Sequence, residues 1–527
     1  MPNIITKGWE GFSGAIKRIL QGDLGQVDIL EKAKQLKPGE MFLANFGWIG
    51  GQVAFVHPDS PEQTAAILNY FDGQPDGRRG ADGEVYFVDA RPIDAQTEMV
   101  GRVHNGIFKN VLMQHEHYID ATLSVLSQQL TSGSFSLAEF VHRPLRAALV
   151  KHLFHVDDYP APLNSALQSF SASMPNQAGS FSAKIFLMLQ LAYFSKWFDW
   201  VASYKKARNT FVNASTQLLL DQADTILNYL HEYGECEGAN RKKGDLISLS
   251  VIELIEADIK RDFQRLKDEG YDVNSESDEN PFNYTQKEIL LGFLGEITKE
   301  ELTPYLLNPY IKTLPATPFA GEMLDTVVVC GMTALARNPE LLADLRTTIA
   351  ETRLLEEENG DAIKAKIDLD RANGGLFYRF FLEALRINSV LKSMDQVLSE
   401  TLLLRYSNKP ASINQLTIPG KTMVSVFSVF PRQDKSKFKQ PEMFDPDRYL
   451  DANGKLNAEL EAIALDAFTQ SMRYCPAKRV APYVFCVMIG KLISEYDFRL
   501  EHEVGETNAS NVKIEVITRE AMNICRP

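Results

Sequence analysis

One cysteine, Cys475, lies in a segment whose composition favours thiolate chemistry. The segment reads FTQSMRYCPAKRVA from Phe468 to Ala481, and it leads into an apolar run of helical character. A thiolate just before a helix is stabilised by free backbone N–H groups and by the helix dipole. The five cysteines are odd in number and have no paired spacing, which excludes a disulfide framework and a zinc ribbon. We therefore single out Cys475 and expect the other four cysteines to be inert buried residues.

A glutamate and an arginine stand three residues apart on an expected helix upstream of this segment. The apolar residues of LFYRFFLEALR, from Leu376 to Arg386, form one helical face. Glu383 and Arg386 are neighbours at i and i+3 on the surface of that helix, where an ion pair can form. Such pairs are common on solvated helices and contribute under about 1 kcal/mol, so the pattern is weak by itself.

A further arginine follows in the segment PEMFDPDRYLD, which is too rich in proline and aspartate to be a helix. Its residues Phe444, Pro446 and Arg448 have the spacing F-x-P-x-R. Arg448 could reach back to Glu383. A carboxylate held by two guanidinium groups is rigid and suited to pinning an irregular loop against a helix.

The elements that must position these residues are mostly helices. Apolar residues recur at helical spacing over 97–194 and 201–230, and another helix is expected to begin at Pro61. Short strands are expected near both ends of the chain, at 41–46, 52–57, 422–430 and 512–518. The pattern predicts a mainly α protein with small β-sheets. We expect one domain over 1–527, with a β-rich amino-terminal part at about 38–60.

The composition narrows the class of protein. Apolar residues make up 45% and charged residues 24%, which is typical of a globular protein with a substantial core. The 55 Lys and Arg against 69 Asp and Glu give a net charge of −14, the wrong sign for a nucleic-acid partner. The most lipid-like stretch, Ile185 to Phe194, is roughly half the length that spans a bilayer. Because the amino terminus has no signal-peptide pattern, we expect a soluble, cytoplasmic protein without a membrane span.

In their order along the chain, the three motifs resemble those of the cytochrome P450 superfamily of haem-thiolate proteins. They read Glu383-x-x-Arg386, then Phe444-x-Pro446-x-Arg448, then Phe468-x-x-Ser471-x-Arg473-x-Cys475-x-Ala477-x-x-x-Ala481. The resemblance covers most of the chain, from the strand pair near 41–57 to the carboxyl terminus. It implies a cytochrome P450-like fold with a haem-binding region at about 370–527.

The resemblance also implies which residues hold the cofactor, haem b (iron protoporphyrin IX). Cys475 would be the axial ligand of the iron, and its thiolate would push electron density onto the metal. Phe468 would pack against the haem near the sulfur, and Arg473 would pair with a haem propionate. Arg102 and His104 fall where the family often supplies further propionate donors.

The remaining motif residues would support the site and take no part in acid–base catalysis. In the resemblance Glu383, Arg386 and Arg448 lock the loop on the cysteine side of the haem. Where glycines are usual in the family, this chain has Ser471 and Ala477. The turn around the sulfur must therefore accommodate two β-carbons, although both side chains are small.

The family's long central helix carries a small residue pair, then an acid and an alcohol that deliver protons. It ends shortly before an Asn-Pro boundary, here Asn338-Pro339. Counting back by the usual spacing places Ala320 and Gly321 over the haem, Glu322 at the acid and Met323 at the alcohol. A methionine cannot relay a proton.

A competing register of this helix uses Asp325 and Thr326, which lie three residues, just under one helical turn, nearer to the boundary. We favour the first register and keep the second as its alternative. Pro315 and Pro318 either interrupt the helix in its interior or force it to begin just there.

Three functions are compatible with the resemblance. The leading hypothesis is a monooxygenase that oxidises a small apolar compound with O2 and electrons from a separate ferredoxin or flavin donor. The alternative is a peroxide-using or hydroperoxide-rearranging enzyme of the allene oxide synthase, prostacyclin synthase or peroxygenase type, which needs no donor and no proton relay and so suits Met323. The third hypothesis is a non-catalytic haem-binding or sensor protein.

A cluster of cations lies close in sequence to these motifs. Its members are Arg432, Lys435, Lys437 and Lys439, with Asp434 as the single acid among them, and Lys478 and Arg479 directly after the cysteine loop. We expect this cluster to be a docking surface for an acidic electron donor. The alternative interpretation is a solvated loop.

Overall fold

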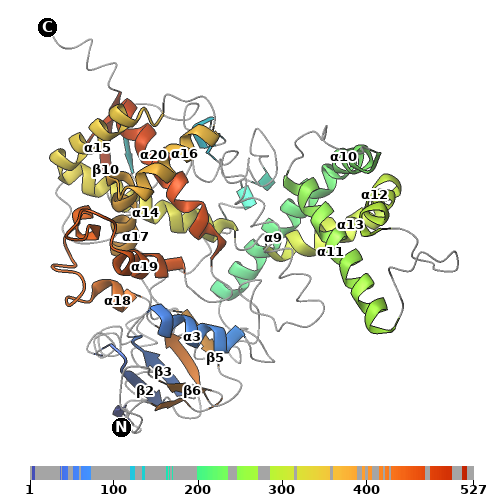
Figure 1. Ribbon diagram of the computed structural model, residues 1–527, viewed down its shortest axis with the longest axis horizontal. Helices are drawn as coiled ribbons and strands as arrows, with labels where there is room; N and C mark the ends of the chain where they lie inside the picture. The colour runs from blue at the N-terminus through green and yellow to red at the C-terminus, as the bar shows by residue number, and fades with distance from the viewer. Residues whose placement is uncertain are drawn as a thin grey trace.

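The computed structural model describes residues 199–235, 246–270, 285–313, 317–355, 360–388, 429–468 and 475–500, and short stretches within 3–72, 119–169, 394–426 and 513–518. Figure 1 shows two groups of helices, one within 199–313 and one within 317–495, and a small sheet beside the second group. Helices predominate and the sheets are small. The predicted mainly α class is therefore confirmed.

Strands from both ends of the chain form one five-stranded sheet in the order β1-β2-β3-β8-β5. The strands are β1 (Asn3–Ile5), β2 (Met41–Asn45), β3 (Gln52–Val56), β8 (Met423–Val426) and β5 (Met394–Val397). β2 and β3 pair antiparallel, which confirms the predicted strand pair, whereas the turn between them lies outside the described residues. β3 pairs parallel with β8, so the region of the motifs is tied to the amino-terminal part. Helix α3 (Pro61–Asp72) begins at the predicted proline.

Two smaller sheets complete the β structure of the described residues. The first has the order β4-β10-β9, from β4 (Gly133–Ser136), β10 (Lys513–Thr518) and β9 (Tyr496–Leu500). The second is a hairpin of β6 (Leu402–Arg405) and β7 (Gln415–Ile418). The predicted strand at 512–518 is thus confirmed.

The strand expected at 422–430 is shorter than predicted. β8 ends at Val426, and Val429 opens the short helix α18 (Val429–Gln433). Pro431 suits this helix, because it lies in the first turn, where its missing N–H is not needed.

Five helices form the first group, and they have an apolar core of their own. They are α9 (Asp199–Asp221), α10 (Ala223–Glu235), α11 (Leu246–Asp268), α12 (Gln286–Glu296) and α13 (Lys299–Thr313). The core includes Phe211, Leu230 and Leu294, which are buried. α10 approaches α12 so closely that a β-carbon on Gly234 would lie 2.4 Å from the backbone nitrogen of Gly295. The predicted helical pattern over 201–230 is confirmed, whereas most of 97–194 lies outside the described residues.

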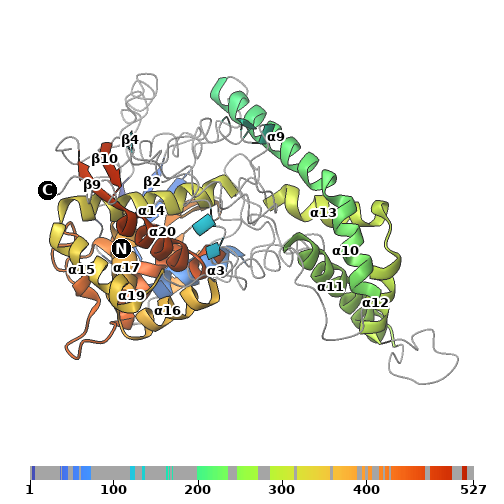
Figure 2. The same cartoon turned by 90° about the horizontal axis from the view of Figure 1, so that it is seen from above.

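The second group surrounds helix α17. Its helices are α14 (Thr317–Arg337), α15 (Pro339–Thr352), α16 (Gly360–Ala372), α17 (Leu376–Ile387), α19 (Ala458–Leu465) and α20 (Ala481–Glu495). α17 contacts α14, α16, α19 and α20, and it is buried from Phe377 to Arg386. Figure 2 shows this group to one side of α9–α13.

Prolines set both ends of α14 as the sequence indicates. α13 ends at Thr313 and α14 begins at Thr317, so Pro318 lies in the first helical turn and the helix begins just there. At the other end Asn338 caps α15, since its side chain accepts a hydrogen bond from the Leu341 N–H. The predicted boundary at Asn338-Pro339 is confirmed.

Among the described helices, none combines the length and the apolar character that crossing a bilayer requires. A cytoplasmic location stays a prediction. The single-domain assignment for 1–527 also stays a prediction, since the two helix groups have separate apolar cores.

Candidate functional site

Helix α17 carries the first motif, and the turn before it fixes where the helix begins. Gly374 has a φ of +64°, a left-handed conformation that glycine adopts without strain. The N-cap residue Gly375 has no capping side chain, and the Asp370 carboxylate on α16 accepts the Tyr378 N–H at 2.9 Å instead. A carboxylate here also complements the positive end of the helix dipole. The start of α17 is therefore bound to α16.

The ion pair of the first motif is buried. Glu383 is 0% and Arg386 is 1% exposed. The pair is buried because α17 is covered on all sides, which its one apolar face does not reveal. Arg386 donates from Nε to Glu383 Oε2 at 2.8 Å and from Nη2 to Oε1 at 2.7 Å. The pair is bidentate, as the strongest guanidinium–carboxylate pairs are.

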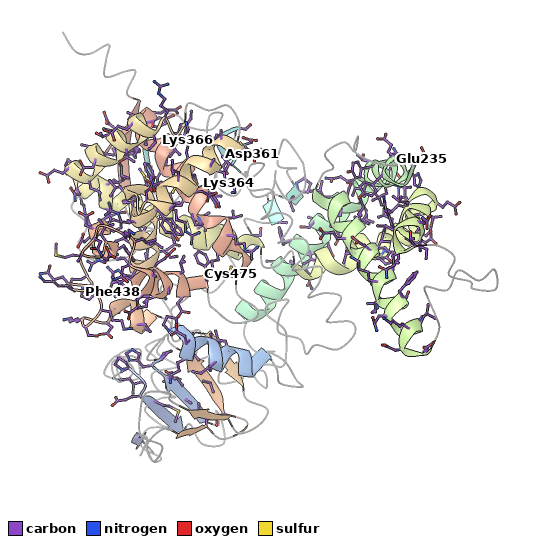
Figure 3. All side chains as sticks on the ribbon, viewed as in Figure 1. Glu235, Asp361, Lys364, Lys366, Phe438 and Cys475 are labelled. Atoms are coloured by element: carbon purple, nitrogen blue, oxygen red, sulfur yellow. The ribbon has the colours of Figure 1, made fainter. Side chains whose placement is uncertain are left out.

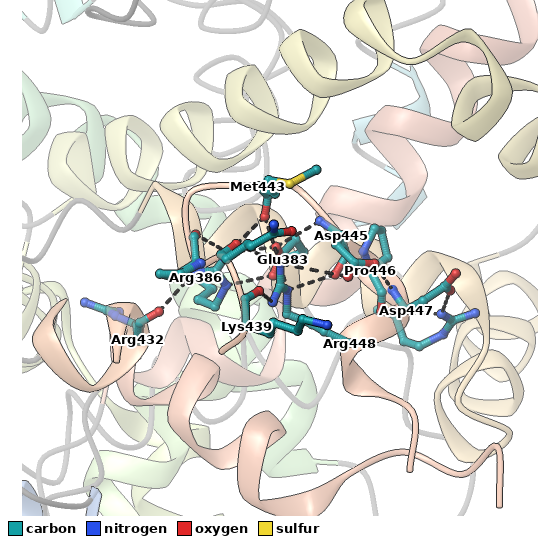
Figure 4. Close-up of polar contacts among 12 residues, drawn as sticks. Glu383, Arg386, Arg432, Lys439, Met443, Asp445, Pro446, Asp447 and Arg448 are labelled. Atoms are coloured by element: carbon teal, nitrogen blue, oxygen red, sulfur yellow. Dashed lines mark hydrogen bonds and ion pairs between the residues drawn. The ribbon is translucent and has the colours of Figure 1, made fainter. Parts of the chain in front are cut away.

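Arg386 also binds the chain that leads to the second motif. Its guanidinium donates to the carbonyl oxygens of Arg432 at 2.9 Å and of Pro441 at 2.7 Å (Figure 4). Burial works to lower the pKa of Arg386, but the hydrogen bonds and charge of Glu383 outweigh it and raise the pKa above its usual value. Arg386 therefore stays charged where water is excluded.

Arg448 reaches Glu383, as the sequence predicts. Its Nε donates to Glu383 Oε1 at 3.1 Å, and the Asp445 backbone N–H donates to the same oxygen at 3.0 Å. Arg448 also donates to the carbonyl oxygens of Lys439 at 2.7 Å and Met443 at 2.9 Å. The segment forms no α-helix, as expected, but Pro446–Tyr449 makes one 3-10 turn. The site thus holds one carboxylate between two arginines (Figure 4).

A third arginine near the site, Arg379 on α17, was missed by the motif analysis. It is 9% exposed, donates from Nε to the Gly374 carbonyl at 2.8 Å and forms an ion pair with Asp447. It lies four residues before Glu383, so both side chains are on the same face of the helix. The spacing R-x-x-x-E-x-x-R along this face was the signal that could have indicated it.

A backbone hydrogen bond between Phe468 and Cys475 closes the loop before the cysteine. Its N–H donates to the Phe468 carbonyl oxygen at 2.8 Å, and its own carbonyl oxygen accepts the Lys478 N–H at 3.1 Å. Cys475 is partly exposed, and it lies at the edge of the second helix group in Figure 3. A 3-10 turn, Pro476–Arg479, separates it from the start of α20 at Ala481. The helix therefore starts where the sequence predicts it, and the Lys478 N–H of the turn bonds to the Cys475 carbonyl oxygen.

The other two cysteines of the described part of the chain lie in less suitable surroundings. Burial, followed by the charge of Glu383, raises the pKa of the Cys330 thiol to about 12. Burial raises the pKa of Cys486 well above its usual value. Both are poor sources of a thiolate, since the charged form is disfavoured out of water. No cluster of three or more His, Cys, Asp or Glu side chains in the described segments could hold a metal ion.

Several predicted site residues cannot be compared with the structure. Arg102, His104, Ser471 and Arg473 lie outside the described residues. Ala320, Gly321, Glu322, Met323 and Asp325 lie on α14, whose backbone is described there. Thr326, also on α14, accepts a hydrogen bond at its carbonyl oxygen from the Asn388 side chain at 3.4 Å. Phe468 is partly buried against the apolar core. Both registers of the central helix stay predictions.

The cationic cluster is smaller than the sequence suggests. Arg432 is 0% exposed, because it lies under α19, and Lys437 pairs with Glu459 at 2.8 Å. The inclusion of Arg432 was therefore wrong, whereas Lys437 is partly exposed and shares its charge with Glu459. Lys435, Lys439 and Arg479 are exposed.

Comparison with known proteins agrees with this architecture. The family model described as Cytochrome P450 matches residues 326–524. The rat protein named Sterol 26-hydroxylase, mitochondrial (Rattus norvegicus) is 24% identical over 40% of this chain and 37% of its own length. Cytochrome P450 705A12 of Arabidopsis thaliana is 23% identical over 43% of this chain and 44% of its own length. The matches thus span less than half the length of these two relatives.

A solved structure extends the likeness to nearly the whole chain. The structure described as retinoic acid bound cyanobacterial CYP120A1 has a TM-score of 0.56 at 12% identity and covers 96% of each chain. The fold and the buried Glu383 site define a helical protein built around a cysteine loop. The family match over 326–524, the sequence relatives and the shared fold support the cytochrome P450 superfamily.

Proposed function

We propose that this chain is a haem-thiolate oxidoreductase in which Cys475 would supply the thiolate that holds the haem iron. The observation that carries the proposal is the backbone hydrogen bond from the Cys475 N–H to the Phe468 carbonyl oxygen, which closes the loop before the cysteine. A loop that must present a sulfur atom to a rigid cofactor needs a rigid support. The buried pair of Glu383 and Arg386, with Arg448, makes the preceding segment at 439–448 rigid.

The residues of the loop fit the cofactor that the family implies, haem b. Cys475 is partly exposed and precedes the 3-10 turn Pro476–Arg479, whereas burial raises the pKa of both Cys330 and Cys486. Helix α14, which we expect to face the haem, packs on α17 and α20. It therefore shares an apolar core with the helix that follows the cysteine. Bound haem would supply the redox chemistry, with the thiolate favouring O–O cleavage. Arg473, Arg102 and His104 are our proposed propionate partners.

The protein's own residues would hold and shield the site. Glu383 and its two arginines fix residues 439–448, which we call the meander. Within it Phe444 packs on Phe380 of α17 with ring centroids 5.2 Å apart. Phe468 would cover the sulfur side of the haem. On the opposite side we place Ala320 and Gly321, with Glu322 and Met323, or Asp325 and Thr326 in the second register, as the residues that face the substrate.

More specifically, we propose that the chain is a monooxygenase. It would oxidise a small apolar compound with O2 and with electrons from a ferredoxin or flavin protein. Lys435, Lys439 and Arg479 are exposed cations that suit an acidic donor. The relatives named as hydroxylases and monooxygenases support this reaction class.

The experiment that tests the reaction compares three oxidant systems on the purified holoprotein. These are hydrogen peroxide, a fatty-acid hydroperoxide, and O2 with a reduced ferredoxin or flavoprotein. We expect turnover of apolar probe compounds with the donor system. Turnover with a peroxide alone would replace the monooxygenase by the peroxide-using alternative, and stable haem without any turnover would leave the sensor hypothesis.

A further inference from the structure

Helix α19 leads directly into the cysteine loop. It ends at Leu465, the 3-10 turn Asp466–Phe468 follows, and the Phe468 carbonyl oxygen accepts the Cys475 N–H. The place of α19 therefore sets where the loop begins. Among the described residues, no side-chain hydrogen bond joins Glu383, Arg386 or Arg448 to α19. The link is indirect, since Arg386 donates to the Arg432 carbonyl oxygen on α18 and α18 contacts α19.

One carboxylate on α19, Glu461, fixes this helix to its neighbours. The Tyr378 hydroxyl on α17 donates to Glu461 Oε1 at 2.6 Å, and Arg371 Nη2 on α16 donates to the same oxygen at 3.0 Å. The Arg371 guanidinium also lies 4.9 Å from the centre of the Tyr378 ring. The Glu461 side chain is 17% exposed and Tyr378 is 1% exposed. Hydrogen bonds to a charged group are stronger than neutral ones and are stronger still where water is excluded.

The tyrosine stays a hydrogen-bond donor over the whole working range of pH. Burial, followed by the charge of Glu461, raises the pKa of Tyr378 far above its usual value. The contact thus does not depend on a titration of the phenol.

We propose that Glu461 is a positioning residue for Cys475, holding the start of the cysteine loop through Tyr378 and Arg371. The inference rests on the proposed haem-thiolate function. It adds a second carboxylate anchor, at the loop itself, to the Glu383 site that holds the preceding meander.

The same helix offers a matched control. Glu459 lies two residues before Glu461, and its side chain is 67% exposed and pairs with Lys437. Exposed ion pairs contribute little. Glu461→Gln and Glu459→Gln remove the same charge from one helix. The first removes it at the contact with Tyr378 and Arg371, and the second removes it away from that contact.

The test measures the loop in the holoprotein of the wild type, Glu461→Gln, Glu459→Gln and Tyr378→Phe. The first readout is the Soret spectrum of the ferrous carbon-monoxide complex, which separates thiolate ligation from neutral ligation. The second is hydrogen exchange of peptides covering 466–480, which contain the Cys475 N–H. Exchange should rise roughly tenfold in Glu461→Gln, which corresponds to about 1.4 kcal/mol. Tyr378→Phe should shift both readouts in the same direction by less, and Glu459→Gln should match the wild type.

The outcomes separate this inference from the function on which it rests. Wild-type protein without a thiolate-type spectrum would overturn the proposed function. A wild type with that spectrum, joined to Glu461→Gln and Tyr378→Phe proteins with unchanged spectra and exchange, would overturn the positioning role alone. Should Glu461→Gln yield no folded protein, the milder Tyr378→Phe decides between these results. A double variant whose effect is smaller than the sum of the two single changes would support a shared contact.

Discussion

At the scale of single residues, Glu383 is the carboxylate on which three parts of the chain converge. It accepts hydrogen bonds from Arg386, Arg448 and the Asp445 N–H, and it is fully buried. Removing one member of a buried ion pair leaves the other charge out of water without compensation. The site therefore depends on the complete set of partners more than on the attraction within any one pair.

Glu383→Gln is expected to lower the free energy of unfolding by about 3 to 5 kcal/mol, because Arg386 and Arg448 lose their shared anion. Denaturant titration of the holoprotein measures the change. Glu442→Gln is the control, since Glu442 is exposed on the same meander and should have an effect within about 0.5 kcal/mol. Equal stability of the two variants would contradict the structural role of Glu383.

Asp466 gives a pH dependence with a definite sign. It is 1% exposed, and burial raises its pKa from 3.8 to about 7, although Arg432 and Lys478 favour the anion. The folded state then binds a proton that the unfolded chain releases, so this group's contribution to stability falls as the pH rises from about 4 to about 7.

In Asp466→Asn that fall should be absent, since asparagine does not ionise. The free energy of unfolding of the wild type and the variant, measured at several values between about pH 4 and pH 8, gives the difference. A difference that does not change with pH would show that Asp466 does not titrate in this range.

At the scale of elements, the start of α17 depends on a glycine and on a carboxylate from α16. A β-carbon on Gly375 would lie 1.9 Å from Asp370 Oδ1, the side chain that caps α17 at Tyr378. The carboxylate would have to move, and α17 would lose its cap.

Gly375→Ala is therefore expected to destabilise the protein by about 1 to 2 kcal/mol, the range for losing a helix cap. Gly292→Ala on α12 is the matched control, because its added β-carbon meets nothing within 4 Å. There alanine should stabilise by up to about 1 kcal/mol. Thermal unfolding of the two variants should shift in opposite directions, and a shift of the same sign would refute the capping account.

The elements themselves could be predicted well from local patterns. The apolar face of α17, the β2–β3 pair and the cap at Asn338 are each encoded within a few neighbouring residues. The burial of Arg386 and Arg432 could not be predicted in this way, because it arises from helices distant in sequence that cover α17 and α18. For the same reason the local charge pattern overestimated the cationic surface.

At the scale of the whole molecule, the motifs lie in one helix group and a second group has its own core. The family resemblance named the cysteine and its supporting arginines, since these belong to short motifs. Glu461 and Asp466 escaped notice because their partners come from separate helices and no short pattern joins them.

Donor-supported turnover is expected to fall as salt rises, if the exposed Lys439 and Arg479 guide an acidic partner. Screening acts over a Debye length of about 8 Å at physiological ionic strength. Lys439→Glu and Arg479→Glu should slow donor-supported turnover and leave peroxide-supported turnover unchanged. Equal salt effects on both reactions would argue against a docking surface at these residues.

The most direct test of the central claim is the Soret spectrum of the ferrous carbon-monoxide complex in wild-type and Cys475→Ser protein. Cys330→Ala serves as the control, since burial raises the pKa of that thiol to about 12. We predict the red-shifted band of a thiolate-ligated haem in the wild type and the control, and its loss in Cys475→Ser. A Cys475→Ser protein that kept this band would contradict the assignment of Cys475 as the haem ligand.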